Sequence, residues 1–469
     1  MSSTKKMAEF THSLEYHDIP SDVREHLKLC LLDAIGCGMY GSKLPWGQKL
    51  ISAIQGMTTE DVPGGVSVFG QDKKFAPDHA ALINGTLIHS FEFDDLHKTA
   101  VIHPGAEVLP VLLALAEHMA NKGEKVTGKQ FVTALAVGYE VGCQVGMVTG
   151  AEQLNKGFHP SATSGVFGAA AAGAKLLNLT YNETLHAIGI AGTQASGLMS
   201  AQYEAMVKRM NPGKSAQSGV LSALLAREGF TGITNVLEAE YGGFAKVFAD
   251  KSIDDSEDFK DLGEKYEILN VGFKPYSCCG SNHTTIDSIL EIIAERQDDF
   301  TAELIDQVEI GTTTATKHHV GWDYKPSGTI GAQMNLSYAA AVTILDRVCS
   351  VEQYSNDRIE SSDVNHLINK IKVTINEDFD KLGREGRHSI RLKVRMKTGE
   401  VITKDKKHAK GSMFFPLTKA EVERKFLHLA TILFSPAEAD EKLENIKNVG
   451  DEDDIQEFLK QLNEPSLWR

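Results

Sequence analysis

Cysteine is scarce and scattered in this chain. Six cysteines occur among 469 residues, and they form no paired C-x-x-C units of the kind that hold zinc. Cys278 and Cys279 are adjacent, and adjacent cysteines rarely reach each other within disulfide geometry. We therefore expect reduced thiols, as in a cytoplasmic enzyme, with Cys30, Cys37 and Cys143 serving as buried packing residues.

Long apolar runs and several common motifs are also missing. No run of eighteen apolar residues exists and the first ten residues lack the apolar core of a secretory signal, so the sequence predicts neither a membrane span nor export. No G-x-G-x-x-G motif follows a predicted strand, and neither G-x-x-x-x-G-K-[ST] nor G-x-S-x-G is present. The sequence thus gives no support to nucleotide chemistry or to a serine hydrolase.

Basic residues are outnumbered by acidic ones. Lys and Arg together number 48 and Asp and Glu 63, which gives a formal net charge of −15. Such diffuse acidity argues against nucleic acid or an anionic membrane as a partner. It makes the basic group Lys208, Arg209 and Lys214 informative, and we expect this group in a loop between helices. Either it recognises an acidic small molecule or it forms surface ion pairs.

The chain does contain a long series of helical patterns. Its length exceeds what one hydrophobic core usually supports, so two domains are expected. Apolar residues at helical spacing predict helices in the first half at Val23 to Gly41, Pro77 to His89, Val108 to Met119, Gly128 to Val148 and Ser164 to Leu177. The last of these is rich in Gly and Ala, which indicates a tightly packed core helix.

The pattern changes near Val271. Alternating and β-branched residues predict strands, with helices between them, at Asp306 to Thr314, Ile371 to Ile375, Ile390 to Met396 and Val401 to Thr403. The intervening helices are expected at Thr284 to Glu295 and Thr329 to Asp346, and helical spacing returns after Gly411. The predicted fold is mostly α, with a large helical domain formed by residues 1–270 and 410–469 and an inserted α+β domain at 271–409.

One short segment combines more ionisable groups than any other. Residues 91–105 carry three acids and two histidines: Glu92, Asp94, Asp95, His97 and His103. Burying so many charges without partners is costly, so the segment is either a solvated loop or the floor of a site. His103 precedes Pro104, which favours a turn, and an imidazole there can donate or accept a proton near neutral pH. The other interpretations are a structural histidine and a metal site with ligands Asp94, His97 and His103, whose spacing matches no standard signature.

Two further segments carry isolated basic groups. His159 also precedes a proline, so it lies on a loop leading into the Gly/Ala helix, where free backbone N–H groups favour a carboxylate. An ordinary N-cap is the other interpretation of that loop. Lys274, Tyr276 and His283 lie where the composition changes, and they either line a cleft between domains or belong to a solvated linker.

In their order along the chain, these segments resemble the MmgE/PrpD family. The resemblance runs over nearly the whole chain and rests on Leu32-Asp-Ala-Ile-Gly-Cys37, the acidic segment ending in His103-Pro104-Gly105, Gly157-Phe158-His159, Val207-Lys208-Arg209, Lys274-Pro275-Tyr276 and Ala332-Gln-Met-Asn-Leu-Ser-Tyr338. Within the family, Thr193 to Tyr203, Glu240 to Phe244 and Tyr276 to Gly280 are most similar to the fungal cis-aconitate decarboxylases.

The resemblance implies a helical domain with a smaller α+β lid, a homodimer, and neither a metal nor an organic cofactor. It implies a lyase that acts on a small di- or tricarboxylate, with decarboxylation of cis-aconitate to itaconate as the first expectation. Dehydration of 2-methylcitrate, an epimerisation of the iminodisuccinate type and non-catalytic carboxylate binding are the alternatives.

Carried over by motif, the family's catalytic residues fall on His103, His159, Lys208, Tyr338 and Asp95. Its substrate contacts are expected at Glu92, Lys274, Arg209 and His97. Leu96 stands where the mammalian decarboxylase has threonine, and Glu92 where it has aspartate, so the contacts of this strip differ. In this hypothesis Lys208, His159 and Lys274 bind carboxylates while a protonated His103 delivers a proton to carbon.

Overall fold

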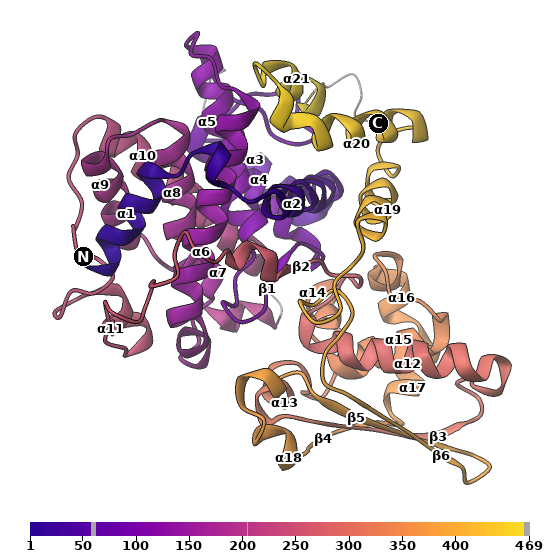
Figure 1. The fold of residues 1–469 in the computed structure, drawn as a ribbon. Helices are drawn as coiled ribbons and strands as arrows, with labels where there is room; N and C mark the ends of the chain where they lie inside the picture. The colour runs from indigo at the N-terminus through magenta and orange to yellow at the C-terminus, as the bar shows by residue number, and fades with distance from the viewer. Residues whose placement is uncertain (58–61, 204, 464–469) are drawn as a thin grey trace.

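The computed structural model describes residues 1–57, 62–203 and 205–463 and has a helical body joined to a smaller α+β part (Figure 1). The body begins with α1 (Ser3–Ser13), α2 (Ser21–Gly41), α3 (Pro45–Gln55), α4 (Pro77–Ile88), α5 (Pro104–Asn121), α6 (Gly128–Asn155), α7 (Pro160–Thr163), α8 (Gly165–Leu176), α9 (Tyr181–Gly192), α10 (Val207–Arg227) and α11 (Phe244–Ala249). The chain later returns to it through α19 (Lys419–Ala430), α20 (Pro436–Asn448) and α21 (Gln456–Asn463). Because α19 and α20 pack on α2, both ends of the chain build the same body.

Residues that favour helix starts set most of these boundaries. Pro77 and Pro104 occupy the first positions of α4 and α5, where a missing N–H is harmless and φ is preset. Thr127 caps α6 by accepting a hydrogen bond from the backbone N–H of Gln130, whose side chain accepts one from the N–H of Thr127. The predicted helices of the first half are therefore confirmed, with α5 starting at Pro104 instead of Val108.

Close helix packing explains the run of small residues in α8. A Cβ on Gly138 of α6 would lie 2.6 Å from Val108 and 2.8 Å from Ala172, and one on Gly168 would lie 2.5 Å from the carbonyl oxygen of Gly138. The small residues thus let α6 and α8 approach closely, as the sequence predicted. Among the described residues, α6 is the one helix long and apolar enough to cross a membrane, and 89% of its apolar window is buried within the helical body.

The α+β part is built on one four-stranded sheet. Its strands are β3 (Ile305–Thr312), β4 (Ile371–Ile375), β5 (Ile390–Met396) and β6 (Val401–Lys406), in the order β4-β3-β5-β6. The β3–β4 pair is parallel, with Val308 opposite Ile371, and the other two pairs are antiparallel. Buried and exposed residues alternate along β5, because helices α12 (His283–Arg296), α15 (Leu336–Asp346) and α17 (Ser362–Ile368) lie over one face of the sheet (Figure 1). The shorter helices of this part are α13 (Thr314–Val320), α14 (Thr329–Gln333), α16 (Asn356–Glu360) and α18 (Glu377–Asp380).

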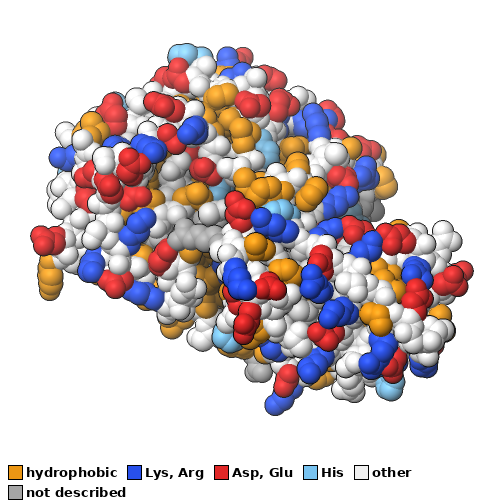
Figure 2. Space-filling view, turned by 60° about the horizontal axis from the view of Figure 1, so that its bottom comes forward, with side chains coloured by type: hydrophobic (Ala, Val, Ile, Leu, Met, Phe, Trp, Pro, Cys, Tyr) orange, Lys and Arg blue, Asp and Glu red, His pale blue; other side chains and the backbone are white. Residues whose placement is uncertain are grey.

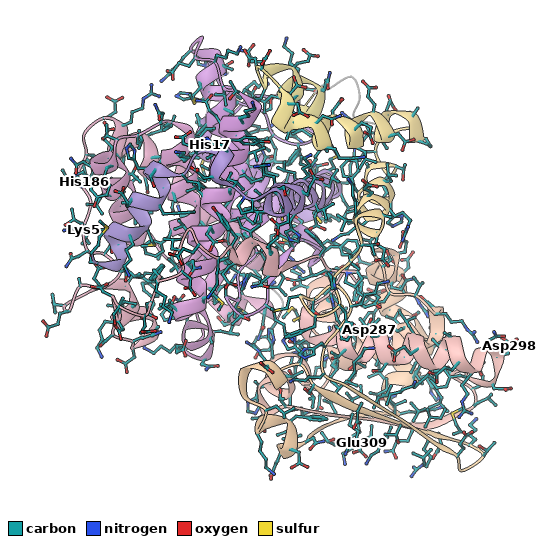
Figure 3. All side chains as sticks on the ribbon, viewed as in Figure 1. Lys5, His17, His186, Asp287, Asp298 and Glu309 are labelled. Atoms are coloured by element: carbon teal, nitrogen blue, oxygen red, sulfur yellow. The ribbon has the colours of Figure 1, made fainter. Side chains whose placement is uncertain are left out.

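Two crossings join the parts. On the outward crossing, β2 (Val271–Gly272) pairs antiparallel with β1 (Leu96–His97) of the acidic segment. Asp287 of α12, labelled in Figure 3, accepts hydrogen bonds from the Tyr276 hydroxyl at 2.5 Å and from the backbone N–H of Lys410 at 2.7 Å, so it ties the outward crossing to the return. The domain boundaries 271 and 409 themselves stay a prediction.

Two local predictions were wrong. The expected loop around Lys208 and Arg209 is the first turn of α10, which continues through Pro212. At Gly213 the close approach of α4 leaves no room for a side chain. The helix expected from Thr329 to Asp346 is two helices, because Asn335 caps α15 by accepting a hydrogen bond from the N–H of Tyr338 at 3.0 Å.

Acidic and basic side chains are interspersed over both parts on the face shown in Figure 2. On that face the negative net charge is therefore dispersed and does not gather into one patch.

Candidate active site

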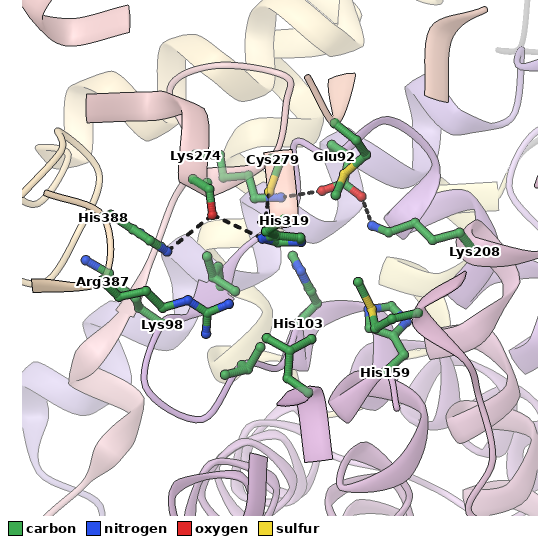
Figure 4. A pocket seen from close by; sticks show the side chains of 17 residues that line it. Glu92, Lys98, His103, His159, Lys208, Lys274, Cys279, His319, Arg387 and His388 are labelled. Carbon is green, nitrogen blue, oxygen red and sulfur yellow. Dashed lines mark hydrogen bonds and ion pairs between the residues drawn. The ribbon is translucent and has the colours of Figure 1, made fainter. Parts of the chain in front are cut away.

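A cleft of about 590 Å³ lies where the two parts meet (Figure 4). Its ionisable lining residues come from both sides of the junction and include Glu92, Lys98, His103, His159, Lys208, Lys274, His319, Arg387 and His388. The cleft thus brings together five residues expected from the sequence that are spread along the chain from position 92 to position 274: Glu92, His103, His159, Lys208 and Lys274.

His103 is fixed at the N-cap of α5. Its backbone N–H donates to the Ser161 hydroxyl at 2.9 Å, and its Nδ1 lies 2.7 Å from the backbone carbonyl of Asp95 and 3.2 Å from a carboxylate oxygen of Asp94. A carbonyl oxygen only accepts, so Nδ1 carries the proton of this contact. Nε2 is then the nitrogen that can exchange a proton with a molecule in the cleft.

Asp94 joins His103 to a second histidine. The same Asp94 oxygen lies 2.8 Å from Nδ1 of His89, and Nε2 of His89 lies 3.3 Å from Nζ of Lys208. Burial alone would raise the pKa of Asp94, but His103 and His89 hold it well below its usual value, whereas burial lowers the pKa of His89. A buried chain of contacts therefore runs from Lys208 through His89 and Asp94 to His103.

The same three groups are the ones that could hold a metal. Within the described ranges, His89, Asp94 and His103 present ligand atoms within 4.8 Å of one another. His97, which the sequence placed in a possible metal set, lies elsewhere and contacts Glu267. Nδ1 of His89 hydrogen-bonds to Asp94 and Nδ1 of His103 lies 3.2 Å from the same oxygen, so in the present arrangement Asp94 orients both rings.

Glu92 is the centre of a buried ion cluster. Its carboxylate contacts Lys208, lies 2.7 Å from Nη1 of Arg209 and 3.1 Å from Nζ of Lys274. Its backbone has φ of 54°, a left-handed conformation that is uncommon outside glycine and is often found at functional sites. One carboxylate therefore faces three cations, which leaves the cluster with excess positive charge.

Gln333 holds this cluster in place. The sequence analysis did not identify it as a residue that supports the site. Its side-chain oxygen accepts a hydrogen bond from Arg209 at 2.6 Å, while its amide nitrogen donates to the carbonyls of Phe91 at 2.8 Å and Ser277 at 2.7 Å. Gln333 thus connects the α+β part to the acidic segment. Burial, with repulsion from Arg209 and Lys274, lowers the pKa of Lys208 well below its usual value, and the Glu92 contact opposes this.

His159 is a neutral donor in this structure. It is the N-cap residue of α7, and its Nδ1 accepts a hydrogen bond from the amide of Asn211 at 3.0 Å. Burial and the neighbouring His103 lower the pKa of His159 to about 3. His159 would therefore offer a neutral N–H to a substrate, in place of the charge-assisted contact that the sequence suggested.

The α+β part supplies polar residues that the sequence analysis missed. Nδ1 of His319 and Nε2 of His388 lie 3.2 and 3.4 Å from the hydroxyl of Ser281, and Cys279 is 4.0 Å from His319. Arg387 lines the same side. In the sequence these residues are marked only by the pair Arg387-His388, which lies just before a predicted strand and far from the other motifs.

Four predicted site residues lie outside the cleft lining. Tyr338 donates to the backbone carbonyl of Gln353 at 2.6 Å. His97 lies 3.0 Å from Glu267, because β1 turns it away from His103. Arg209 sits behind Glu92. These positions do not favour direct substrate contact by Tyr338, His97 or Arg209.

Asp95, the fourth of these residues, lies outside the cleft lining and helps to position His103. Its carboxylate accepts hydrogen bonds from the Tyr139 hydroxyl at 2.8 Å and from the N–H of Gly105 at 3.0 Å. Burial, with Asp33 and Asp94 nearby, raises the pKa of Asp95 to about 7. Its backbone carbonyl orients His103, so its contribution is one of position.

Comparison with known proteins agrees with this architecture. The model of the MmgE/PrpD N-terminal domain matches residues 5–256, and that of the MmgE/PrpD C-terminal domain matches residues 276–450. The chain is 33% identical over 459 residues to the cis-aconitate decarboxylase-like protein oryM of Aspergillus oryzae, covering 95% of this chain and 93% of that protein. It is 32% identical over 475 residues to the cis-aconitate decarboxylase of Aspergillus terreus, covering 98% and 96%.

A 2-methylcitrate dehydratase of Escherichia coli is 27% identical over 230 residues, which is 46% of each chain. The similarity to the decarboxylases thus extends over the whole length, while that to the dehydratase covers less than half. Two family models that together span most of the chain show that it belongs to the MmgE/PrpD family.

Proposed function

We propose that this protein is a lyase that decarboxylates cis-aconitate to itaconate. The observation that carries the proposal is the charge of the cleft. Its lining includes four basic side chains, Lys98, Lys208, Lys274 and Arg387, and the single carboxylate of Glu92. With Lys208 kept protonated by its contact with Glu92, these five side chains carry a net charge of about +3. A chain of net charge −15 has concentrated positive charge in one partly buried place, which suits a small polyanion such as a tricarboxylate.

The reaction balances with one proton. Carbon dioxide leaves from the carboxylate on the methylene carbon, and the bonding pair forms a new double bond to the central carbon. The original double-bond pair moves to the vinylic carbon, where a proton from Nε2 of His103 attaches. The trianion and one proton thus give the itaconate dianion and CO₂, and His103 regains its proton from solvent.

Fixed cations would lower the barrier to this step. As CO₂ departs, negative charge spreads over the remaining unsaturated acid and its carboxylates. Lys208 and Lys274 stand in the cleft before the reaction begins, so little reorganisation accompanies the charge shift. Asp94 lies 3.2 Å from Nδ1 of His103 and helps to hold the ring of the proton donor in place.

The same groups could serve a dehydratase, and the partial similarity to 2-methylcitrate dehydratase favours that reaction as the second candidate. Incubation with cis-aconitate, 2-methylcitrate and iminodisuccinate, followed by NMR and CO₂ detection, separates the possibilities. We expect CO₂ and itaconate from cis-aconitate. Water loss from 2-methylcitrate with no CO₂ from cis-aconitate would instead identify a dehydratase, and inversion of iminodisuccinate an epimerase. Binding without any product would indicate a non-catalytic carboxylate-binding protein.

We further propose that the protein acts as a homodimer in the cytoplasm, without a cofactor. All six cysteines are free and buried, which suits a reducing compartment. Sedimentation at several protein concentrations tests the dimer, and a single species of monomer mass would contradict it.

A further inference from the structure

The cleft contains two cations for which the proposed proton transfer has no use, Lys98 of the helical body and Arg387 of the α+β part. Lys98 follows β1, and Arg387 precedes β5. In Figure 4, Lys208 and Glu92 stand on one side of the cleft and Arg387 and His388 on the other. The cleft therefore has two basic ends, of which Glu92 neutralises only one.

Lys98 and Arg387 lack a counter-charge among the residues that the structure describes. Neither side chain forms an ion pair there, and Nε of Arg387 is buried without a hydrogen-bond partner. Burial is the main cause that lowers the pKa of Lys98 to about 8, and repulsion from Arg387 and Lys407 adds to the shift. Two cations held near one another out of water are unfavourable without an anion, so this end of the cleft favours the binding of an anion.

The backbone that carries Arg387 is held in place. The hydroxyls of Thr313 and Thr316 both donate to the carbonyl of Arg387, at 2.7 and 2.6 Å. The hydroxyl of Thr284 donates to the next carbonyl, that of His388, at 2.9 Å. Three hydroxyls from α12 and the start of α13 thus hold the backbone of Arg387 and His388 in place. Such support is typical of a binding site and not of a loose surface loop.

A second hollow leads to the same place. It has a volume of about 460 Å³ and shares Lys98, Lys274 and His388 with the cleft. Its other ionisable lining residues are His283 and Lys410, so all its ionisable side chains are basic. An anion entering along this path would meet Lys98 where the two hollows adjoin.

We propose that Lys98 and Arg387 form a second anion subsite, which binds one carboxylate while Lys208 and Lys274 hold the opposite end of the substrate. This inference rests on the proposed function and adds to it: the subsite makes the cleft selective for acids with a carboxylate at each end over monocarboxylates. His319 and His388, both kept neutral by burial, border the subsite and can donate an N–H to the same carboxylate.

Equilibrium binding tests the subsite without requiring turnover. Tricarballylate is a tricarboxylate with no double bond to shift, and butyrate is a monocarboxylate that can occupy only one end of the cleft. Calorimetry would compare both ligands on the wild type, Arg387→Gln, Lys98→Gln and the conservative Arg387→Lys. Lys381→Gln is the matched control, because Lys381 is an exposed cation of the α+β part that pairs with Asp378 away from the cleft lining. Urea unfolding of each variant verifies that it is folded.

We expect Arg387→Gln and Lys98→Gln each to weaken tricarballylate by roughly tenfold to a hundredfold, the size of a lost charge-assisted contact. Butyrate should change by less than about threefold, because its single carboxylate can still bind at Lys208 and Lys274. Arg387→Lys should recover part of the loss, and Lys381→Gln should have no effect. Equal losses for both ligands, or no loss for tricarballylate, would overturn the subsite. Because binding alone is measured, a failure here is distinct from a failure to release CO₂ from cis-aconitate.

Discussion

Nδ1 of His103 lies 3.2 Å from a carboxylate oxygen of Asp94, and both side chains are buried at the junction of the two parts. Asp94→Asn keeps the shape and an acceptor oxygen but removes the negative charge beside the imidazole ring. We expect turnover of cis-aconitate to fall by roughly 10- to 1000-fold, because the ring is then held less firmly. Steady-state kinetics measure this loss.

The control for this variant is Asp306→Asn, at an exposed acid that pairs with Arg395 on the sheet surface. It should leave the rate unchanged. Turnover of Asp94→Asn equal to that of the wild type would show that Asp94 has no part in the proton transfer.

His103 itself should separate chemistry from binding. In His103→Gln the proton donor is gone, while the cations that hold the carboxylates remain. We expect kcat to fall by about 10²- to 10⁴-fold, with tricarballylate binding changed by less than about threefold. Steady-state kinetics and calorimetry measure the two quantities. A variant that loses binding as much as turnover would place His103 among the substrate-holding groups instead.

The fold could be predicted from the sequence largely because helix ends carry local signals. The residues before Pro104 and Pro160 are forced out of the helix, and this predicted a turn at His103 and a loop at His159, which the structure places at the N-caps of α5 and α7. The loop expected around Lys208 was wrong, because α10 continues through Pro212 and packs closely against α4 at Gly213.

The site was only half predictable. Glu92, His103, His159, Lys208 and Lys274 lie in segments whose unusual composition marks them. Arg387 and His319 lie in ordinary-looking stretches and reach the cleft only through the sheet and its connections, which no local pattern encodes. Tyr338 lies in a motif that resembles the family, and the resemblance predicted a catalytic role for it. Its hydroxyl instead donates a hydrogen bond to the backbone carbonyl of Gln353, outside the cleft lining.

The Glu92 cluster predicts a coupling between stability and ligand binding. Glu92→Gln leaves Lys208, Arg209 and Lys274 without their shared anion, and breaking a buried pair in this way costs about 3–5 kcal/mol. Urea unfolding should show that loss in the free protein. Addition of tricarballylate should restore more stability to the variant than it adds to the wild type, because its carboxylates supply the missing charge.

A surface pair provides the comparison. Glu291 pairs with Lys406 on the sheet, and Glu291→Gln should cost less than about 1 kcal/mol and respond to the ligand as the wild type does. If Glu92→Gln were as stable as Glu291→Gln without ligand, the three cations would have to be neutral or otherwise compensated.

Glu140 predicts a pH dependence of stability that is independent of the active site. It is fully buried in α6, and burial raises its pKa to about 7, although the Gln144 side chain and backbone N–H groups partly oppose the shift. The unfolded chain loses this proton near pH 4.5, whereas the folded protein keeps it up to about pH 7. Folding therefore binds the proton between these values, and stability falls as pH rises through that window.

Glu140→Gln removes the titration and keeps the hydrogen bonds, since its amide can still accept from the N–H of Ile268 and donate to Gln144. We expect little change in the free energy of unfolding at pH 5 and a gain on the order of 2–3 kcal/mol at pH 8, because the variant no longer has to bury a carboxylate. Urea unfolding at the two pH values measures this. Glu9→Gln, at an exposed acid of α1, should change stability at neither pH, so an equal response of the two variants would show that Glu140 is not buried as the structure has it.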